Sequence, residues 1–308
     1  MLSVINTLRQ GSPRPEELDE LVPSRYALRV GEIDVLVISD GAFPLPATTL
    51  ATNASPDDLA AWLGDQLQPL DVYKWPLNVV VVRSGDRTVL IDAGMGDEYP
   101  DEPRAGGLLA HRLEAAGIDP ASVTDVVLTH MHMDHIGGLL ADGLKSRLCP
   151  DVPIHLAAVE VDFWMSPDFS RNTFGGFPDV LRSTAKRFVD EYGSQLRPFD
   201  TECEVAPGVV VHRTGGHTPG HSVVRLTSGS DRLTFIGDAV FPDHFARPDW
   251  FNAFDHDPEE AVRVRTDLLT ELAATGEPLV ATHLSFPSVG RVALDDEGFR
   301  WVPATWEY

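Results

Sequence analysis

The chain has 308 residues, 43% of them hydrophobic, so it is long enough for one large hydrophobic core or two modest ones. With 24 basic and 47 acidic residues the formal charge is −23, and so acidic a surface argues against nucleic acid as a partner. The two cysteines, Cys149 and Cys203, have no metal-binding spacing and form no disulfide framework.

Residues 1–25 are polar and contain prolines, which predicts an N-terminal arm followed by one catalytic domain over residues 26–308. We expect no signal peptide, because this segment has no sufficiently long apolar stretch. We also expect no membrane contact, because no window approaches the roughly 20 apolar residues of a membrane span. A cytoplasmic protein is therefore predicted.

The first half of the chain alternates apolar runs with helical patterns. A helix is predicted over Asp57–Leu67, a loop over Gln68–Pro76, and a second helix over Leu108–Ala116 that stops at Gly117. Strands are predicted at Tyr26–Val30, Ile33–Ile38, Val79–Val82, Thr88–Ile91 and Asp125–Thr129.

The second half repeats this alternation. Aromatic residues in the middle segment, 157–198, predict helices with a mobile loop around Asn172–Pro178. Asp257, Pro258 and Glu260 form a helix start signal, and Gly276 is the matching stop. Strands are predicted at Val209–His212, Ser222–Leu226, Leu233–Ile236 and Leu279–Thr282. The two halves predict an α/β fold of two sheets flanked by helices.

Imidazoles and carboxylates follow several of these strands. Four of them, His130, His132, Asp134 and His135, lie within six positions after the strand that ends at Thr129. His217, Asp238 and His283 each follow a later apolar run, and together these residues could bind two divalent ions. The donor types suit zinc and also manganese, iron, cobalt or nickel. Asp238 is the natural candidate to bridge the ions. A lone histidine is more often an ordinary core or surface residue, and we place His111, His155, His212, His244 and His256 in that class.

The order of these motifs resembles the metallo-β-lactamase superfamily. The resemblance rests on the His130–His135 cluster, the Gly216–His221 segment, Gly237-Asp238, Thr282-His283 and the Asp92-Ala93-Gly94 turn. It implies an αββα sandwich of two mixed β-sheets flanked by helices. It also implies that Asp92 and His221 orient the metal ligands from behind.

Four further segments resemble the methyl parathion hydrolase group and its lactonase relatives. They are Ser39–Pro46, Asp162–Trp164, His283–Gly290 and Gly298–Pro303. The resemblance implies that both metal sites are occupied and that the residue matching Asp238 bridges them. It further implies an aromatic substrate pocket, which Trp164, Phe174 and Tyr99 would line by position. Phe241 stands where quorum-sensing lactonases carry a tyrosine, so no hydroxyl is available there to donate to the substrate carbonyl.

The expected activity is hydrolysis of a lactone or aryl ester, or of a phosphotriester, by a hydroxide that bridges the two metals. Asp134 is the candidate to pass a proton to the leaving group. An acidic protein with an apolar pocket suits a small neutral hydrophobic substrate. The C-terminal Trp301 and Trp306 favour a homodimer contact.

Three alternatives stay open from the sequence. A thioesterase acting on acyl carriers would want a basic patch, and no such cluster is seen in the sequence. A mononuclear iron sulfur dioxygenase would leave part of the ligand set unused. A metal-binding protein without catalytic activity is disfavoured because open two-metal sites are usually catalytic.

Overall fold

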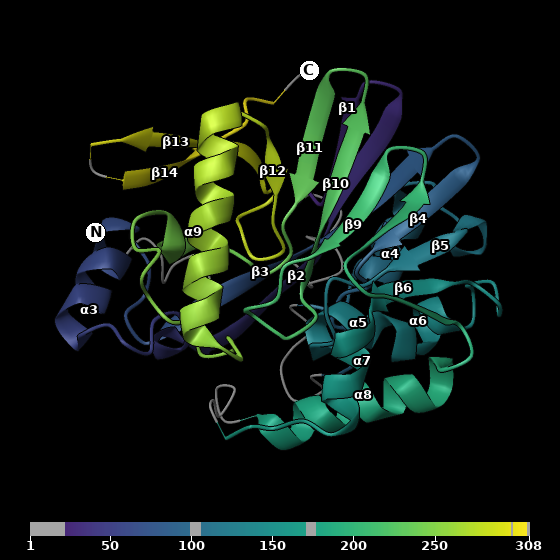
Figure 1. Ribbon diagram of the computed structural model, residues 1–308, viewed down its shortest axis with the longest axis horizontal. Coiled ribbons are helices and arrows are strands. Elements are labelled where there is room, and N and C mark those ends of the chain that lie inside the picture. Colours follow the sequence, from purple (N-terminus) through teal and green to yellow (C-terminus); the bar gives the residue numbers. More distant parts are fainter. Residues whose placement is uncertain (1–21, 99–105, 171–176, 297, 307–308) are drawn as a thin grey trace, which may run out of the picture.

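The computed structural model describes residues 22–98, 106–170, 177–296 and 298–306. Two seven-stranded sheets pack face to face, and helices cover their outer faces (Figure 1). The αββα sandwich predicted from the sequence is confirmed. The predicted N-terminal arm falls largely on residues outside the described ranges, as do most of the loop predicted around Asn172–Pro178 and the residues Tyr99 and Phe174.

The first sheet has the strand order β1-β2-β3-β4-β5-β6-β7. It is antiparallel from β1 to β4 and parallel from β4 to β7. Its strands are β1 (Arg25–Val30), β2 (Ile33–Pro46), β3 (Val72–Ser84), β4 (Arg87–Ile91), β5 (Asp125–Val127), β6 (Ile154–Ala157) and β7 (Leu196–Phe199).

The second sheet has the order β14-β13-β12-β11-β10-β9-β8, in which β11 and β12 run parallel. The neighbouring pairs on either side of that pair are antiparallel, so both sheets are mixed. Its strands are β8 (Glu202–Ala206), β9 (Val209–Arg213), β10 (Ser222–Ser228), β11 (Asp231–Phe235), β12 (Leu279–Val280), β13 (Val289–Asp295) and β14 (Gly298–Pro303).

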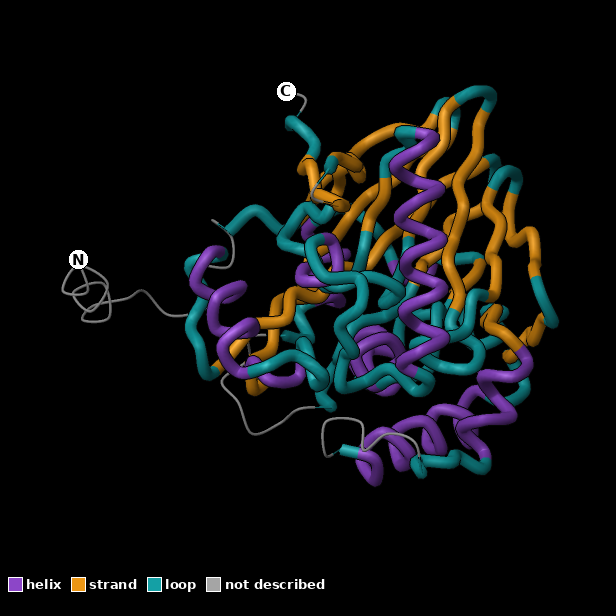
Figure 2. The backbone as a smooth tube through the Cα atoms, turned by 60° about the vertical axis from the view of Figure 1, so that its left-hand side comes forward, coloured by secondary structure: helices purple, strands orange, loops and turns teal. Residues whose placement is uncertain are grey.

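Helices lie on both sides of the sandwich. On the first sheet they are α4 (Leu109–Ala115), α5 (Met133–Leu140), α6 (Asp142–Lys145), α7 (Ala158–Met165) and α8 (Pro178–Tyr192). Helix α9 (Pro258–Thr275) packs on the second sheet and lies along its strands (Figure 2). The structure also describes α3 (Pro56–Asp65) and the 3₁₀ turns η1 (Ala47–Thr49), η2 (Pro120–Ser122) and η4 (Pro242–Phe245).

Strand β3 shows why the sheets are covered on both faces. Its alternate residues Val79 and Val81 pack into the cluster under the helices, whereas Val80 and Val82 pack into the cluster between the sheets. All four are at most 2% exposed. Successive side chains of a strand point to opposite faces, so a continuous valine run requires apolar partners on each side.

One predicted loop needs correction. The predicted loop Gln68–Pro76 is wrong over its second half, because β3 begins at Val72 and pairs with an extended β2 that runs to Pro46. Lys74 and Pro76 obscured the strand pattern in the sequence.

The helix start at Asp257 and the stop at Gly276 are confirmed: the Asp257 side chain accepts from the Glu260 N–H, and Gly276 is left-handed with φ 67°. Among the described residues, no helix is long and apolar enough to cross a membrane.

Candidate metal centre

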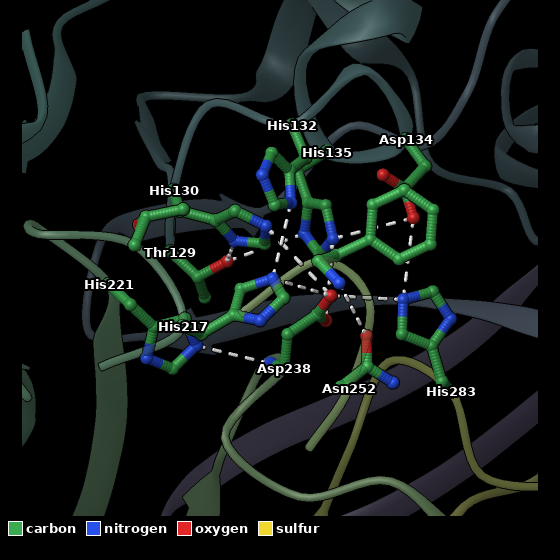
Figure 3. Close-up of polar contacts among 12 residues, drawn as sticks. Thr129, His130, His132, Asp134, His135, His217, His221, Asp238, Asn252 and His283 are labelled. Atoms are coloured by element: carbon green, nitrogen blue, oxygen red, sulfur yellow. Dashed lines mark hydrogen bonds and ion pairs between the residues drawn. The ribbon is translucent and has the colours of Figure 1, made fainter. Parts of the chain in front are cut away.

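The seven predicted ligands come together at one edge of the sandwich, where strands end. His130 and His132 follow β5, Asp134 and His135 lie in the first turn of α5, and His217 lies in the loop between β9 and β10. Asp238 follows β11, and His283 follows β12. Each strand end delivers its side chain toward a shared centre (Figure 3). The sandwich thus brings together residues that are up to 153 positions apart (His130 to His283).

The first cluster of donor atoms, called group one here, contains His130, His132, His217 and Asp238. Their donor atoms all lie within 4.8 Å of one another, and all four residues are buried. His217 Nε2 is 3.1 Å from His132 Nδ1 and 3.4 Å from Asp238 Oδ2. His130 Nε2 is 3.8 Å from the same carboxylate oxygen. Group one therefore offers three imidazoles and one carboxylate.

The second cluster, group two, contains Asp134, His135, Asp238 and His283 within the same limit of 4.8 Å. His283 Nε2 lies 3.0 Å from Asp238 Oδ2 and 3.4 Å from Asp134 Oδ2. His135 Nε2 lies 3.4 Å from Asp238 Oδ1 and 3.6 Å from Asp134 Oδ2. Asp238 belongs to both groups, as the prediction of a bridging carboxylate requires.

Three of the histidines are fixed from behind through their other ring nitrogen. His135 Nδ1 lies 2.8 Å from Asp92 Oδ2, and His283 Nδ1 lies 2.8 Å from the carbonyl oxygen of Pro76. His217 Nδ1 lies 3.0 Å from Asp255 Oδ1. A proton held on Nδ1 by such an acceptor leaves Nε2 as the donor atom toward the centre.

Asp92 sits in a backbone conformation that favours glycine, with φ 59°. Its carboxylate accepts from the backbone N–H and the hydroxyl of Thr129 and faces His135. Asp and Asn tolerate this region better than most residues, and strain of this kind is typical of functional sites. The predicted orienting residue is therefore placed where it contacts a group-two imidazole.

His221, the other predicted orienting residue, lies behind Asp238. Its Nε2 accepts from the backbone N–H of Asp238 at 3.1 Å, and its Nδ1 faces the Thr214 hydroxyl at 2.7 Å. Burial lowers the pKa of His221 to about 3, so the ring is neutral and can accept. Gly237 is required between them, because a Cβ there would lie 2.8 Å from His221 Nε2 at a φ of 51°.

The two groups differ in electrostatics. Burial, together with neighbouring imidazoles, holds the pKa of His130 and of His132 well below its usual value. Burial opposes the charge on His283 too, but Asp238 and Asp134 outweigh it and raise the pKa of His283 to about 9. Burial likewise opposes the charge on Asp134, but His135 and His283 lower the pKa of its carboxyl. A carboxyl with a lowered pKa is ionised at neutral pH, which favours a ligand role for Asp134 over that of a proton donor.

The donor sets fit divalent metal ions. The buried Nε2 atoms of His130 and His135 and Oδ1 of Asp238 lack a hydrogen-bond partner among the described residues, although buried polar atoms are normally satisfied. Zinc–nitrogen bonds of about 2.0–2.1 Å place tetrahedral ligands roughly 3.4 Å apart, close to the separations within each group. An ion in each group would satisfy these atoms.

An apolar pocket opens onto the centre. Asp134, Asp238 and His283 of group two and His132 of group one form one side of it. The remaining lining residues are apolar: Phe43, Leu45, Trp75, Met95, Met133, Phe177, Leu181, Phe241 and Phe254. Phe241 is thus placed at the pocket, with its ring stacked on His283 at a centroid distance of 5.4 Å.

The prediction that Trp164 lines the pocket differs from the structure. Trp164 is 1% exposed and is absent from the pocket wall, because its indole N–H donates to Glu160. Its ring packs edge-on against that of His132, with the ring centroids 5.6 Å apart.

Sequence reasoning also missed Asp255 and Glu160. Neither lies in a recognisable ligand spacing, and their contacts join segments 29 to 60 positions apart.

Comparisons with known proteins agree with this geometry. A model of the family described as "Metallo-beta-lactamase superfamily" matches residues 72–283. The N-acyl homoserine lactonase AttM of Rhizobium johnstonii is 25% identical over 239 residues, which cover 68% of this chain and 82% of that protein. The probable metallo-hydrolase Rv2300c of Mycobacterium tuberculosis is 26% identical over 185 residues. That match covers 53% of this chain and 56% of the relative, so the chain spans little more than half the length of that protein.

A solved structure shares nearly the whole fold. AidC, a dizinc quorum-quenching lactonase whose structure contains a homoserine product, superposes with a TM-score of 0.84 at 25% sequence identity. The match covers 92% of this chain and 99% of AidC.

Proposed function

The chain belongs to the metallo-beta-lactamase superfamily, and from this premise we propose that it is a two-metal hydrolase of small neutral lactones or aryl esters. The observation that carries the proposal is Asp238, whose carboxylate is shared by two buried groups of metal-ligand type beside an apolar pocket. The similarity to AttM and AidC supports a lactone over other substrates.

Divalent ions bound in the two groups would activate water and polarise a carbonyl oxygen at neutral pH. In our proposal His130, His132 and His217 would hold one ion, Asp134, His135 and His283 would hold the other, and Asp238 would contribute its carboxylate to both groups. Zinc suits this donor set, and manganese, iron, cobalt or nickel would also fit.

The substrate is positioned by the pocket wall. Phe43, Trp75 and Phe254 would hold an apolar substituent, while the scissile carbonyl faces the carboxylates and imidazoles of group two. Phe241 has no hydroxyl to offer the carbonyl, so orientation would depend on fit within this wall and on the centre itself. Exclusion of water by the aromatic rings would strengthen electrostatic interactions with the substrate.

The test is metal removal followed by reconstitution. The protein is stripped with a chelator, loaded with one divalent metal at a time, and assayed on a γ-lactone, an N-acyl homoserine lactone, an aryl ester and a phosphotriester. An acyl thioester and a persulfide are added to represent the thioesterase and iron dioxygenase alternatives. The proposal predicts turnover of a lactone or aryl ester that is lost on stripping and returns with metal.

A His111→Ala variant is the matched control, because His111 is exposed and lies in neither group. It should behave like the parent protein. Turnover of the persulfide with a single iron and no hydrolysis of any ester would contradict the proposal. The resemblance to the methyl parathion hydrolase group, the homodimer and the cytoplasmic location stay predictions.

A further inference from the structure

A buried carboxylate outside both ligand groups connects the two loops that carry the histidines of group one. Glu160 lies in the first turn of α7 and is 0% exposed. Glu160 is not among the residues that line the pocket. A fully buried carboxylate needs several donors to offset the loss of water.

Four donors fill its hydrogen-bonding capacity. Oε1 accepts from the backbone N–H of Met131 at 2.9 Å and from the indole N–H of Trp164 at 2.8 Å. Oε2 accepts from the hydroxyl of Thr218 and the backbone N–H of Gly220, both at 2.8 Å. Hydrogen bonds to an ionised carboxylate are stronger than neutral ones and hold their donors in a defined geometry.

These donors flank the metal-ligand histidines in the sequence. Met131 lies between His130 and His132, and Thr218 directly follows His217. The two loops come from different sheets, since one follows β5 and the other joins β9 to β10. Glu160 is thus a single side chain that is hydrogen-bonded to both loops that carry the histidines of group one.

Close packing reinforces this connection. A Cβ at Gly220 would lie 2.4 Å from the Glu160 Cβ, so the second loop approaches α7 as closely as glycine allows. Trp164, held by the same carboxylate, packs edge-on against the His132 ring at 5.6 Å. Movement of Glu160 would therefore displace both sides of group one together. The described contacts of Asp134 and His283 do not include Glu160.

We propose that Glu160 is a positioning residue that sets the metal affinity of group one while leaving group two largely unchanged. The inference rests on the proposed function only in that both groups bind metal. Partners that orient ligands from behind typically change metal affinity by about 10–100-fold when they are lost. A residue that merely stabilised the fold would weaken both groups equally or neither.

The experiment measures metal affinity separately in each group. His283→Ala leaves group one as the intact site, and His217→Ala leaves group two. Glu160→Gln is added to each background, and cobalt is titrated into the stripped protein with the visible spectrum as readout. Glutamine preserves the size of the side chain but replaces one acceptor oxygen with an NH₂ group, which faces N–H donors. We expect about a 10–100-fold loss of affinity in group one and less than about a 3-fold change in group two.

Two further variants keep the test decisive. Thr218→Val removes one donor and should give a smaller loss in group one, so it serves if Glu160→Gln fails to fold. Glu277→Gln is the matched control, because Glu277 is also a buried carboxylate, accepts from the Thr234 hydroxyl, and lies just after α9, outside both loops. It should change neither affinity.

Equal weakening of both groups by Glu160→Gln, or unchanged affinity with a lower melting temperature, would overturn the inference. That failure is distinguishable from failure of the proposed function. In the first case the parent protein still binds two ions and hydrolyses its ester; in the second the parent protein itself binds none or does not hydrolyse.

Discussion

Groups one and two share Asp238 but differ in what surrounds them. Group one is dominated by imidazoles, and Glu160 and Asp255 hold its loops from behind. Group two contains a second carboxylate, Asp134, and opens onto the apolar pocket. We therefore expect the two groups to differ in role, with group one fixed mainly by the fold and group two, together with His132, nearest to a bound substrate.

The electrostatics follow the same division. Burial lowers the pKa of the His130 and His132 imidazoles, so they are neutral and ready to act as ligands. In group two the carboxylates of Asp238 and Asp134 overcome burial and raise the pKa of the His283 imidazole. Group two thus places two carboxylates beside the pocket, and their negative charge favours a bound cation there.

Replacing Asp238 should have the largest effect on metal content and turnover, because this residue belongs to both groups. Asp238→Ala takes a carboxylate from both groups, so we expect loss of at least one ion per chain and a fall in kcat/KM of roughly 1000-fold or more. Elemental analysis and ester hydrolysis measure the two effects. A variant with full metal content and normal turnover would refute the shared-ligand assignment.

Ligands that belong to one group should separate the two. His217→Ala should weaken group one and His283→Ala group two, each by more than the roughly 10–100-fold typical of an outer partner. Because His283 contacts the pocket, its variant should also raise KM, whereas the His217 variant should act mainly on kcat. Metal titration combined with steady-state kinetics checks this difference. Identical changes in metal affinity, kcat and KM for the two variants would contradict the different roles of the two groups.

Replacing a residue that contacts one ligand from behind should weaken metal binding less than replacing the ligand itself. Asp255→Asn leaves an acceptor for His217 Nδ1 but removes a negative charge shared with the buried guanidinium of Arg265. We expect group one to lose about 10–100-fold in metal affinity. Asp257→Asn is the matched control, because asparagine also caps a helix well. Loss of affinity in group two alone would contradict the assignment.

Asp243 is a buried carboxylate outside the centre, and its ionised form should lower the free energy of unfolding, unlike Asp134 and Asp238. Burial raises the pKa of Asp243 from 3.8 to about 7, and Arg265 offsets only part of this. Between these values the unfolded chain binds fewer protons than the folded one, so stability falls as pH rises through the window. Asp243→Asn removes this cost.

The stability advantage of Asp243→Asn should therefore grow between pH 5 and 7 by at most about 1.4 kcal/mol per pH unit and then level off. Urea unfolding of the metal-free proteins at several pH values measures it. A constant difference between variant and parent across the range would show that Asp243 does not titrate in this window.

The seven residues were expected to lie together because each follows an apolar run, and the fold does bring them to one edge of the sandwich. That they bind metal stays a prediction. The sequence predicted the helix over Pro258–Thr275 from its capping residues, since these act locally. It failed at Trp75, which was assigned to a loop but lies in β3 and forms a wall of the pocket. Pairing with β2 overrides the weak local pattern there.

Residues whose role depends on distant contacts could not be found in this way. Glu160 looks like an ordinary charged position in a short helix, and only the fold brings it to Met131 and Gly220. Trp164 was expected at the pocket from its position in the family resemblance, yet it donates a hydrogen bond to Glu160 and packs edge-on against His132.

The most direct test of the two-group centre is a metal count on the purified parent protein. Elemental analysis after removal of loosely bound ions should give two divalent ions per chain, with turnover of a lactone or aryl ester in the same preparation. One iron per chain without hydrolysis would contradict the account and would favour a mononuclear oxygenase.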